Sequence, residues 1–323
     1  MSSSTSSSNR KLVRTGAIVL AAMIALEVVT RTLLVPASND LARFVRYPAD
    51  ARALIAAPGE RIALVGNSTT QAGIDPPLLG ELLGARWHAP VSVRMFAADG
   101  AGIDVIYWMV EHEFARQMLA PDLLIVTFYG NTLEDGERIE VGRLAQFFTD
   151  RADWRELCRF DLPSLSERAD LLLSSLWMTF AVRDRIKERV LDLIPGYKNT
   201  MSEVNAANFH HDQLLDYPPR PTVTTHAALR RFVARQRARG IDVLFVAYPS
   251  KPPPGAEVAY EISDEARRVI AQGGMRLLDL RHIGLQPSDY RDNIHVNDAG
   301  RVVFTRHLSD ALAAMSPPQL SRR

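Results

Sequence analysis

Five short apolar runs constrain the fold of this chain more than any other feature of the sequence. They are rich in leucine or β-branched residues and lack a clean alternation of polar and apolar positions, which is typical of strands covered on both faces. Helical patterns lie between them, so the sequence predicts an α/β protein with three α/β/α layers and a five-stranded parallel sheet. The five runs are residues 61–66, 91–97, 122–128, 241–248 and 275–281.

Two of the intervening helices are clear from their apolar periodicity. One begins after Thr225 and ends at Gly240, just before the fourth run. The other is capped by Asn297 and carries apolar residues at helical spacing from Phe304 to Met315. In parallel sheets of this kind, functional groups lie in the loops beyond the carboxyl ends of the strands. We therefore expect the chemistry in those loops.

The N-terminal region contains an apolar segment at residues 15–35, roughly long enough to cross a bilayer. Glu27 and Arg31 are spaced to pair on a helix near its far end. The favoured interpretation is a single transmembrane anchor. A cleaved secretory signal ending at Val35-Pro36-Ala37 and a buried helix of a soluble protein are the alternatives.

The remaining boundaries follow from that anchor. Residues 1–14 form a polar and basic tail, and 36–60 are expected to be a linker. Basic residues lie on both sides of the span, so charge alone does not fix orientation. A short tail is easier to leave in the cytoplasm, which places the large domain outside. That domain covers residues 61–315, with an insertion at about 132–221, and 316–323 are a tail.

The insertion contains a helical segment at 171–182, which is too short to span a bilayer. A helix packed on the core is favoured over one that leans on the membrane. His210, His211 and Asp212 also fall in the insertion, and a solvated loop is the favoured interpretation because no further metal ligand stands at a recognisable spacing.

Composition excludes several classes of function. Lysine and arginine number 38 against 37 acidic residues, a formal charge of +1, which gives no electrostatic footprint for nucleic acid. The single cysteine, Cys158, excludes an internal disulfide framework and a multi-cysteine metal site. We expect no metal and no organic cofactor.

Reactive residues appear where the predicted strands end. Ser68 follows the first strand and precedes a helix that begins near Pro76, a place where backbone amides can point at a developing anion. Asp292 and His295 lie before the last helix, and an Asp three residues before a His in a loop can hold the imidazole in one tautomer. A nucleophilic serine needs such a base.

With these residues, the sequence resembles the SGNH (GDSL-like) family of hydrolases and acyltransferases, in a membrane-anchored form. The four matching blocks occur in family order at the predicted strand ends, and they are Gly66-Asn67-Ser68, residues 96–102, Tyr129-Gly130-Asn131-Thr132, and residues 292–295. Three positions depart from the family pattern: Asn67 replaces the usual Asp, Tyr129 a glycine, and Thr132 the closing Asp. The α/β-hydrolase architecture is disfavoured because no Gly-x-Ser-x-Gly elbow occurs.

The resemblance implies the SGNH variant of the flavodoxin-like fold and a Ser68-His295-Asp292 triad. It also implies an oxyanion hole formed by the amides of Ser68 and Gly100 and the side chain of Asn131. A membrane-anchored esterase or O-acyltransferase would then act on acyl esters, of which acetyl esters of a surface glycan are favoured, from the periplasmic face of the inner membrane. A multi-span membrane acyltransferase is an expected partner. The alternative is a non-catalytic binding or scaffold subunit with the same fold.

Overall fold

The structure is a computed structural model that describes residues 5–135, 140–192, 196, 225–253 and 255–315. The chain divides into two compact units. The first contains Met1–Val45 and Glu140–Pro218, and the second contains Arg46–Ile139 and Pro219–Arg323.

The second unit is built around a five-stranded, all-parallel sheet with strand order β2-β1-β3-β4-β5. This is the flavodoxin-like order, in which the chain moves outward from β1 to β2 and then crosses to the other side of β1. The predicted five-stranded parallel sheet is therefore confirmed. The strands are β1 (Glu60–Gly66), β2 (Val91–Ala97), β3 (Leu123–Phe128), β4 (Val243–Ala247) and β5 (Arg276–Asp279).

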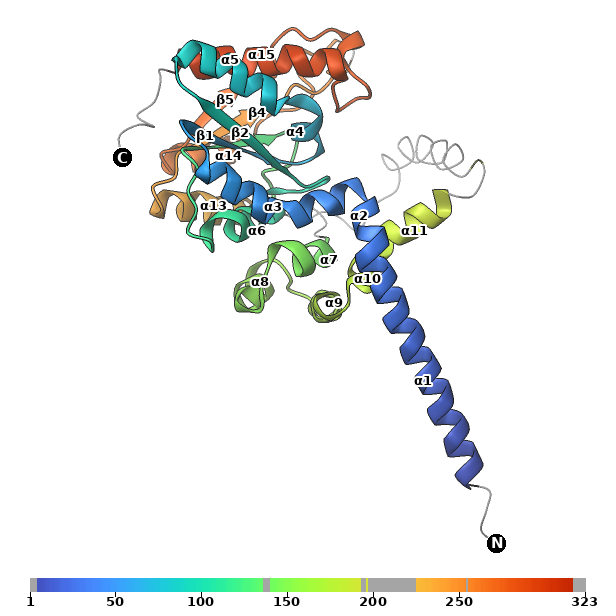
Figure 1. Cartoon of the computed structure of the whole chain (residues 1–323). Helices are drawn as coiled ribbons and strands as arrows, with labels where there is room; N and C mark the ends of the chain where they lie inside the picture. The colour runs from blue at the N-terminus through green and yellow to red at the C-terminus, as the bar shows by residue number, and fades with distance from the viewer. Residues whose placement is uncertain (1–4, 136–139, 193–195, 197–224, 254, 316–323) are drawn as a thin grey trace. The chain divides into compact units, whose positions relative to one another are not determined.

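Helices cover both faces of the sheet, as Figure 1 shows. On one face α5 and α15 pack side by side, and on the other α6 lies against α13, which also contacts α14. The helical elements of this unit are α4 (Ser68–Gly73), α5 (Pro76–Trp87), α6 (Ile103–Val110), η2 (Glu111–Ala115), α13 (Ala227–Ala238), α14 (Asp264–Gln272), η5 (Pro287–Asp289) and α15 (Asp298–Ala314). Their placement gives the three predicted layers.

The core explains why these helices form where they do. On one face, Phe304 and Leu308 of α15 pack with Leu79 of α5 against Ile62 and other buried strand residues. Helix α15 is capped by Asn297, whose side chain accepts a hydrogen bond from the Gly300 amide at 3.0 Å, as its sequence predicts. Burial of this apolar stripe holds α15 on the sheet.

The first unit is helical in its described part. Its N-terminal helix α1 continues through η1, a π-helical turn, into α2, so that residues Asn9–Ala37 form one helical stretch long and apolar enough to cross a membrane by length and composition. The bounds are α1 (Thr5–Val29), η1 (Thr30–Leu34), α2 (Val35–Ala37), α7 (Val141–Arg143), η3 (Leu144–Phe148), η4 (Arg151–Asp153), α8 (Trp154–Phe160), α9 (Leu165–Leu176), α10 (Met178–Ala181) and α11 (Arg183–Asp192).

Two segments differ from expectation. Most of the expected linker forms helix α3 (Asn39–Ala56), which begins in the first unit and ends in the second. Its Tyr47 hydroxyl donates to the Ala97 carbonyl at 2.7 Å and accepts from the Ala97 amide at 2.9 Å.

The predicted helix at 171–182 is instead two helices, α9 and α10, because Trp177 has an extended backbone between them. The tail at 316–323 lies outside the described residues.

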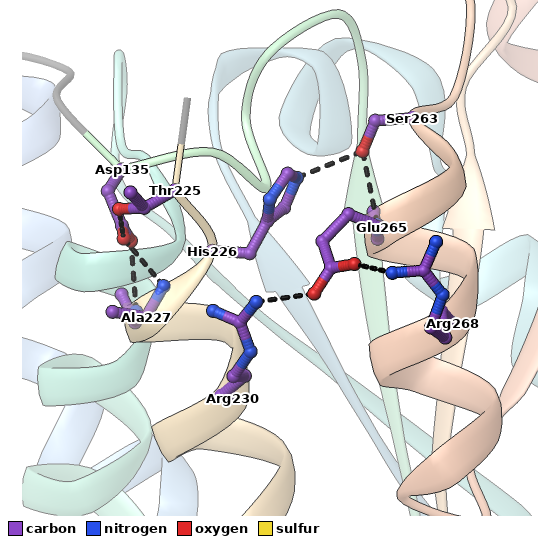
Figure 2. Close-up of polar contacts among 10 residues, drawn as sticks. Asp135, Thr225, His226, Ala227, Arg230, Ser263, Glu265 and Arg268 are labelled. Atoms are coloured by element: carbon purple, nitrogen blue, oxygen red, sulfur yellow. Dashed lines mark hydrogen bonds and ion pairs between the residues drawn. The ribbon is translucent and has the colours of Figure 1, made fainter. Parts of the chain in front are cut away.

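Asp135 and Thr225 lie on either side of Glu140–Pro218, the part of the insertion that belongs to the first unit, and they are joined by hydrogen bonds. The Asp135 amide donates to the Thr225 carbonyl at 2.8 Å, and its carboxylate accepts from the hydroxyl of Thr225. The same carboxylate accepts from the amides of Ala227 and Ala228 at 2.5 and 2.9 Å, which are otherwise unsatisfied donors at the start of α13 (Figure 2). Asp135 therefore caps α13 from a distance and closes the insertion.

This cap leads to a stability prediction. Asp135→Ala removes the acceptor of both helix amides, so we expect the free energy of unfolding to fall by about 1–2 kcal/mol. Asp135→Asn keeps an oxygen that accepts these bonds and is expected to lose much less. Urea unfolding of the two variants is the measurement. Equal losses in both would show that the carboxylate charge, rather than the cap, is what stabilises this junction.

Candidate active site

Three of the predicted site residues lie in adjacent loops at the carboxyl edge of the sheet. Strand β1 lies between β2 and β3, and Ser68, Gly100 and Asn131 stand a few residues beyond the ends of these three strands. The direction of the chain reverses between β1 and β3, and ligands of doubly wound sheets bind at such a switch point. The topology therefore gathers these residues at the expected place for a site.

Ser68 is the first residue of α4, held by a tight cap. The Asn67 side chain accepts from the Thr69 amide at 3.0 Å, and the Thr70 hydroxyl accepts from the Asn67 amide at 3.1 Å. Asn67 thus serves as a helix cap in place of the acidic residue usual in the resembled family. The result is a half-buried Ser68 hydroxyl at a fixed point just past β1.

Gly66 makes this tight turn possible. A Cβ atom at position 66 would overlap the Thr70 hydroxyl and crowd Thr127 of β3. Those two hydroxyl groups are hydrogen-bonded to each other behind the serine. The glycine is therefore required by close approach, because any side chain would push α4 away from the sheet.

His295 reaches Ser68 from the far end of the chain. The Ser68 Oγ lies 2.9 Å from His295 Nε2, and Asp292 Oδ2 lies 2.9 Å from His295 Nδ1. A carboxylate on Nδ1 holds the proton on that nitrogen, which leaves Nε2 free to accept from the serine hydroxyl. The structure brings these three predicted residues into one hydrogen-bonded chain.

Backbone amides of its own loop orient the Asp292 carboxylate. Its Oδ1 accepts from the amides of Ile294 and His295 at 2.8 and 2.7 Å. Burial acts to raise the pKa of Asp292, but these backbone hydrogen bonds, together with the bond from the imidazole, lower that pKa to about 2. The carboxylate is thus ionised across the whole range in which a histidine acts as a base, although 48% of its side chain is exposed.

A buried tyrosine just past β4 fixes the histidine loop. The Tyr248 hydroxyl, at the end of β4, accepts from the Val296 amide at 3.1 Å, immediately after His295. Next to it, the Lys251 amide donates to the Asn293 carbonyl at 3.1 Å. Burial raises the pKa of the Tyr248 phenol, so it stays neutral. No local motif marks such a contact, since its partner is 48 residues away.

Removal of this hydroxyl gives a second prediction. Tyr248→Phe leaves the buried Val296 amide without an acceptor, so we expect a loss of about 1–3 kcal/mol in unfolding free energy. Because His295 is the adjacent residue, kcat of any reaction in which His295 acts as the base is expected to fall by about tenfold or more. Tyr107→Phe is the control, since it removes another buried hydroxyl, bonded to Arg235 at 3.1 Å. A loss of stability without a loss of kcat in Tyr248→Phe would contradict the positioning role.

The two remaining predicted donors lie in the loops after β2 and β3. Gly100 is exposed in a turn with φ of +68°, and no neighbouring atom would meet a Cβ there. Asn131 is half-buried, in a turn where the Thr132 hydroxyl donates to the Tyr129 carbonyl at 2.6 Å. Thr132 thus shapes this loop in place of the family's closing Asp. The assignment of Gly100 and Asn131 as oxyanion donors stays a prediction.

A second serine–histidine pair provides an internal comparison. Ser263 Oγ lies 2.9 Å from His226 Nε2, the same separation as in the first pair (Figure 2). However, no described residue partners the buried His226 Nδ1, and the Ser263 oxygen already accepts from the Ala266 amide to cap α14. A base of this kind lacks the carboxylate that stabilises its charged form. The pair therefore joins α13 to α14 and makes no triad.

Within the described part of the chain, no group of three or more His, Cys, Asp or Glu side chains is arranged to hold a metal ion. His210, His211 and Asp212 lie outside that part.

Comparison with known proteins finds no matching family model and no matching curated protein. Similar solved structures include LAE5, an alpha/beta hydrolase enzyme from the metagenome of Lake Arreo, Spain, with 17% identity, a TM-score of 0.41, and coverage of 81% of this chain and 98% of that one. Axe2, an acetylxylan esterase from Geobacillus stearothermophilus, has 12% identity, a TM-score of 0.41, and coverage of 84% and 100%. A lipase/acylhydrolase from Enterococcus faecalis has 13% identity, a TM-score of 0.39, and coverage of 80% and 97%. These similarities are too distant to indicate a function. The strand order is the evidence for the fold, and the interatomic distances are the evidence for the site.

Proposed function

We propose that this protein is a serine esterase or O-acyltransferase of the SGNH type. The single observation that carries the proposal is the hydrogen-bonded chain from Ser68 through His295 to Asp292, with 2.9 Å on each side of the imidazole. Serine, base and orienting carboxylate in this order are the parts that acyl transfer through serine requires.

The mechanism follows from these contacts. Ser68 Oγ attacks the ester carbonyl carbon while His295 Nε2 takes its proton, and Asp292 stabilises the imidazolium that forms. The oxyanion is met by the amides of Ser68 and Gly100 and the side chain of Asn131, each donor lowering the barrier by about 2.7–4 kcal/mol. His295 then returns the proton to the departing alcohol, which leaves an acyl-Ser68. Water or a sugar hydroxyl attacks this ester, again with His295 as base, and frees the serine.

The N-terminal helix gives the proposed setting. Asn9–Ala37 would cross the inner membrane once and hold the catalytic unit on its periplasmic side. Acetyl esters of a surface glycan are the proposed substrate class. A multi-span membrane acyltransferase is the proposed supplier of acyl groups in the transferase version, because a tethered serine acceptor can take an acyl group that is delivered across the bilayer.

The test uses the full chain in detergent micelles with a chromogenic acetyl ester, with and without a glycan acceptor. The esterase version predicts prompt chromophore release at the same rate in both conditions. The transferase version predicts slow release that the acceptor accelerates, together with acetylated glycan detected by mass spectrometry. Absence of both release and acetylation in folded protein would overturn the proposal.

A further inference from the structure

Helix α9 carries an apolar stripe on its exposed side. The stripe consists of positions at i, i+4, i+7, i+8 and i+11, which is the spacing of a single helix face. All five are exposed, and its leucines are each between 45% and 81% exposed. The leucine stripe contains Leu165, Ala169, Leu172, Leu173 and Leu176.

The opposite side of α9 is already occupied by its own unit. Leu171 and Ser174 are buried, and the Gln146 side chain donates to the Ser174 carbonyl at 2.5 Å. The orientation of the helix is therefore set by contacts on the buried side. A helix fixed with its leucines outward exposes a contiguous apolar surface that water does not favour.

The segment that follows α9 is joined to the N-terminal helix. The Glu27 carboxylate of α1 accepts from the amides of Met178 and Thr179 at 3.0 and 2.9 Å, and from the Thr179 hydroxyl at 2.9 Å. The Thr179 hydroxyl also lies 2.9 Å from that of Thr30. Helix α10, whose first amides need such an acceptor, is thus held at the level of residues 27–30.

The length of the anchor places that level close to the lipid. The charge-free stretch between Arg14 and Glu27 is only twelve residues. At 1.5 Å per residue it spans about 18 Å, short of the roughly 30 Å of a hydrocarbon core. Glu27 forms an ion pair with Arg31 at 2.7 Å, and its carboxylate oxygens accept hydrogen bonds from the first residues of α10. These contacts stabilise the carboxylate at a membrane depth where an isolated carboxylate would be unfavourable.

The residues beside the stripe match a membrane interface in chemistry. Trp177 stacks on Phe180 with ring centroids 6.4 Å apart, and the Arg183 guanidinium lies 4.0 Å from the Phe180 ring centroid. Aromatic rings and cations of this kind gather at the level of lipid headgroups. Together with the leucine stripe, they have the composition of a helix that lies in the plane of the interface.

We propose that the leucine stripe of α9 is embedded in the lipid leaflet from which the anchor emerges, so that the first unit is held at the membrane by two elements. The occupant of the stripe is lipid, at the boundary of headgroups and acyl chains. The inference rests on the proposed membrane anchoring and extends it. The charge-free part of α1 is shorter than the hydrocarbon core, and α9 and α10 add apolar contacts with lipid beside it.

The experiment measures depth in the full chain, reconstituted into phosphatidylcholine–phosphatidylglycerol vesicles that contain no other protein. Cys158→Ser removes the only native cysteine. An environment-sensitive fluorophore is then attached to Leu172→Cys or Leu176→Cys and quenched by lipids that carry a nitroxide near the headgroup or deep in the acyl chain. Leu20→Cys reports the span, and Arg306→Cys, on an exposed position of α15, reports water.

The expected result is loss of fluorescence at positions 172 and 176 with the shallow quencher, at position 20 with the deep quencher, and at position 306 with neither. Quenching at position 20 alone would overturn the α9 inference while leaving the anchor intact, and would point to a protein partner for the stripe. Absence of quenching at all four positions would overturn the anchor itself. Circular dichroism of each labelled protein verifies that its helices are formed.

Discussion

Ser68→Ala is expected to abolish covalent labelling by a fluorophosphonate probe and to lower the rate of ester hydrolysis by about 10⁴- to 10⁶-fold. The oxygen that would attack the substrate is the one that lies 2.9 Å from His295 Nε2, and no other described hydroxyl lies within hydrogen-bond distance of that nitrogen. The cap of α4 uses Asn67 and Thr70, so the substitution leaves the local fold in place. The loss should therefore be chemical, with an unchanged melting temperature.

Ser263→Ala is the matched control for this experiment. It removes a serine at the same 2.9 Å distance from a histidine, but the pair lacks the orienting carboxylate. We expect this variant to label fully and to lose only about 1 kcal/mol in stability, through the cap of α14. Equal labelling of wild type and Ser68→Ala would remove Ser68 as the nucleophile. Folded wild-type protein that does not label at all would favour the non-catalytic scaffold alternative.

Asp292→Asn is expected to lower kcat by up to about 10⁴-fold while leaving the loop folded. The asparagine keeps an oxygen for the amides of Ile294 and His295, but its NH₂ group can donate to His295 Nδ1. The imidazole then carries its proton on Nε2 and can no longer accept one from Ser68. Steady-state kinetics with the chromogenic ester is the measurement, and KM is expected to change much less than kcat.

The pKa of Asp292 makes this variant informative about pH. Because folding lowers the pKa from its ordinary 3.8 to about 2, the stability contributed by the carboxylate is complete above 3.8 and is lost as pH falls through about 2. Wild-type activity above pH 4 is therefore independent of Asp292 ionisation.

The control for Asp292→Asn is Asp298→Asn, which removes the charge of a fully exposed carboxylate on the next helix. A similar loss of kcat in both variants would contradict the tautomer argument.

Much of the sheet could be predicted because its strands are short, continuous apolar runs, which are a direct consequence of burial on both faces. The predicted run 91–97 matches β2 residue for residue, and no end of the other predicted strands differs from the observed end by more than two residues. Helix α15 was also predictable, since Asn297 and the apolar stripe after it act within one helix. Local signals of this kind need no knowledge of distant contacts.

Helix α3 was missed although the sequence carried a signal for it. Its buried residues recur at helical spacing, but Pro48 lies inside the helix, and a proline at that place is typical of a break in a helix. Only the packed structure shows what that periodicity serves. The buried positions are Leu41, Phe44, Tyr47, Ala51 and Leu54.

For the candidate site, short motifs predicted which groups would react, but they carried no information on the residues that position the surrounding loops. Ser68, Asp292 and His295 were identified from short motifs, because the chemistry demands those residue types. The contacts of Tyr47 with Ala97 and of Tyr248 with Val296 join positions about fifty residues apart, and a phenol buried for such a purpose looks like any core tyrosine. Supporting residues of this kind become visible only in three dimensions.

The junction at Asp135 and Thr225 has a consequence for how such a chain can diversify. A polypeptide that departs from and rejoins a scaffold at one spot leaves the scaffold's strand register independent of whatever lies between. The entropic cost of closing a loop grows only with the logarithm of its length. Replacing or lengthening the inserted segment therefore lowers the stability of the scaffold only slightly. Evolution can therefore replace or lengthen the insertion without changing the residues of the candidate site.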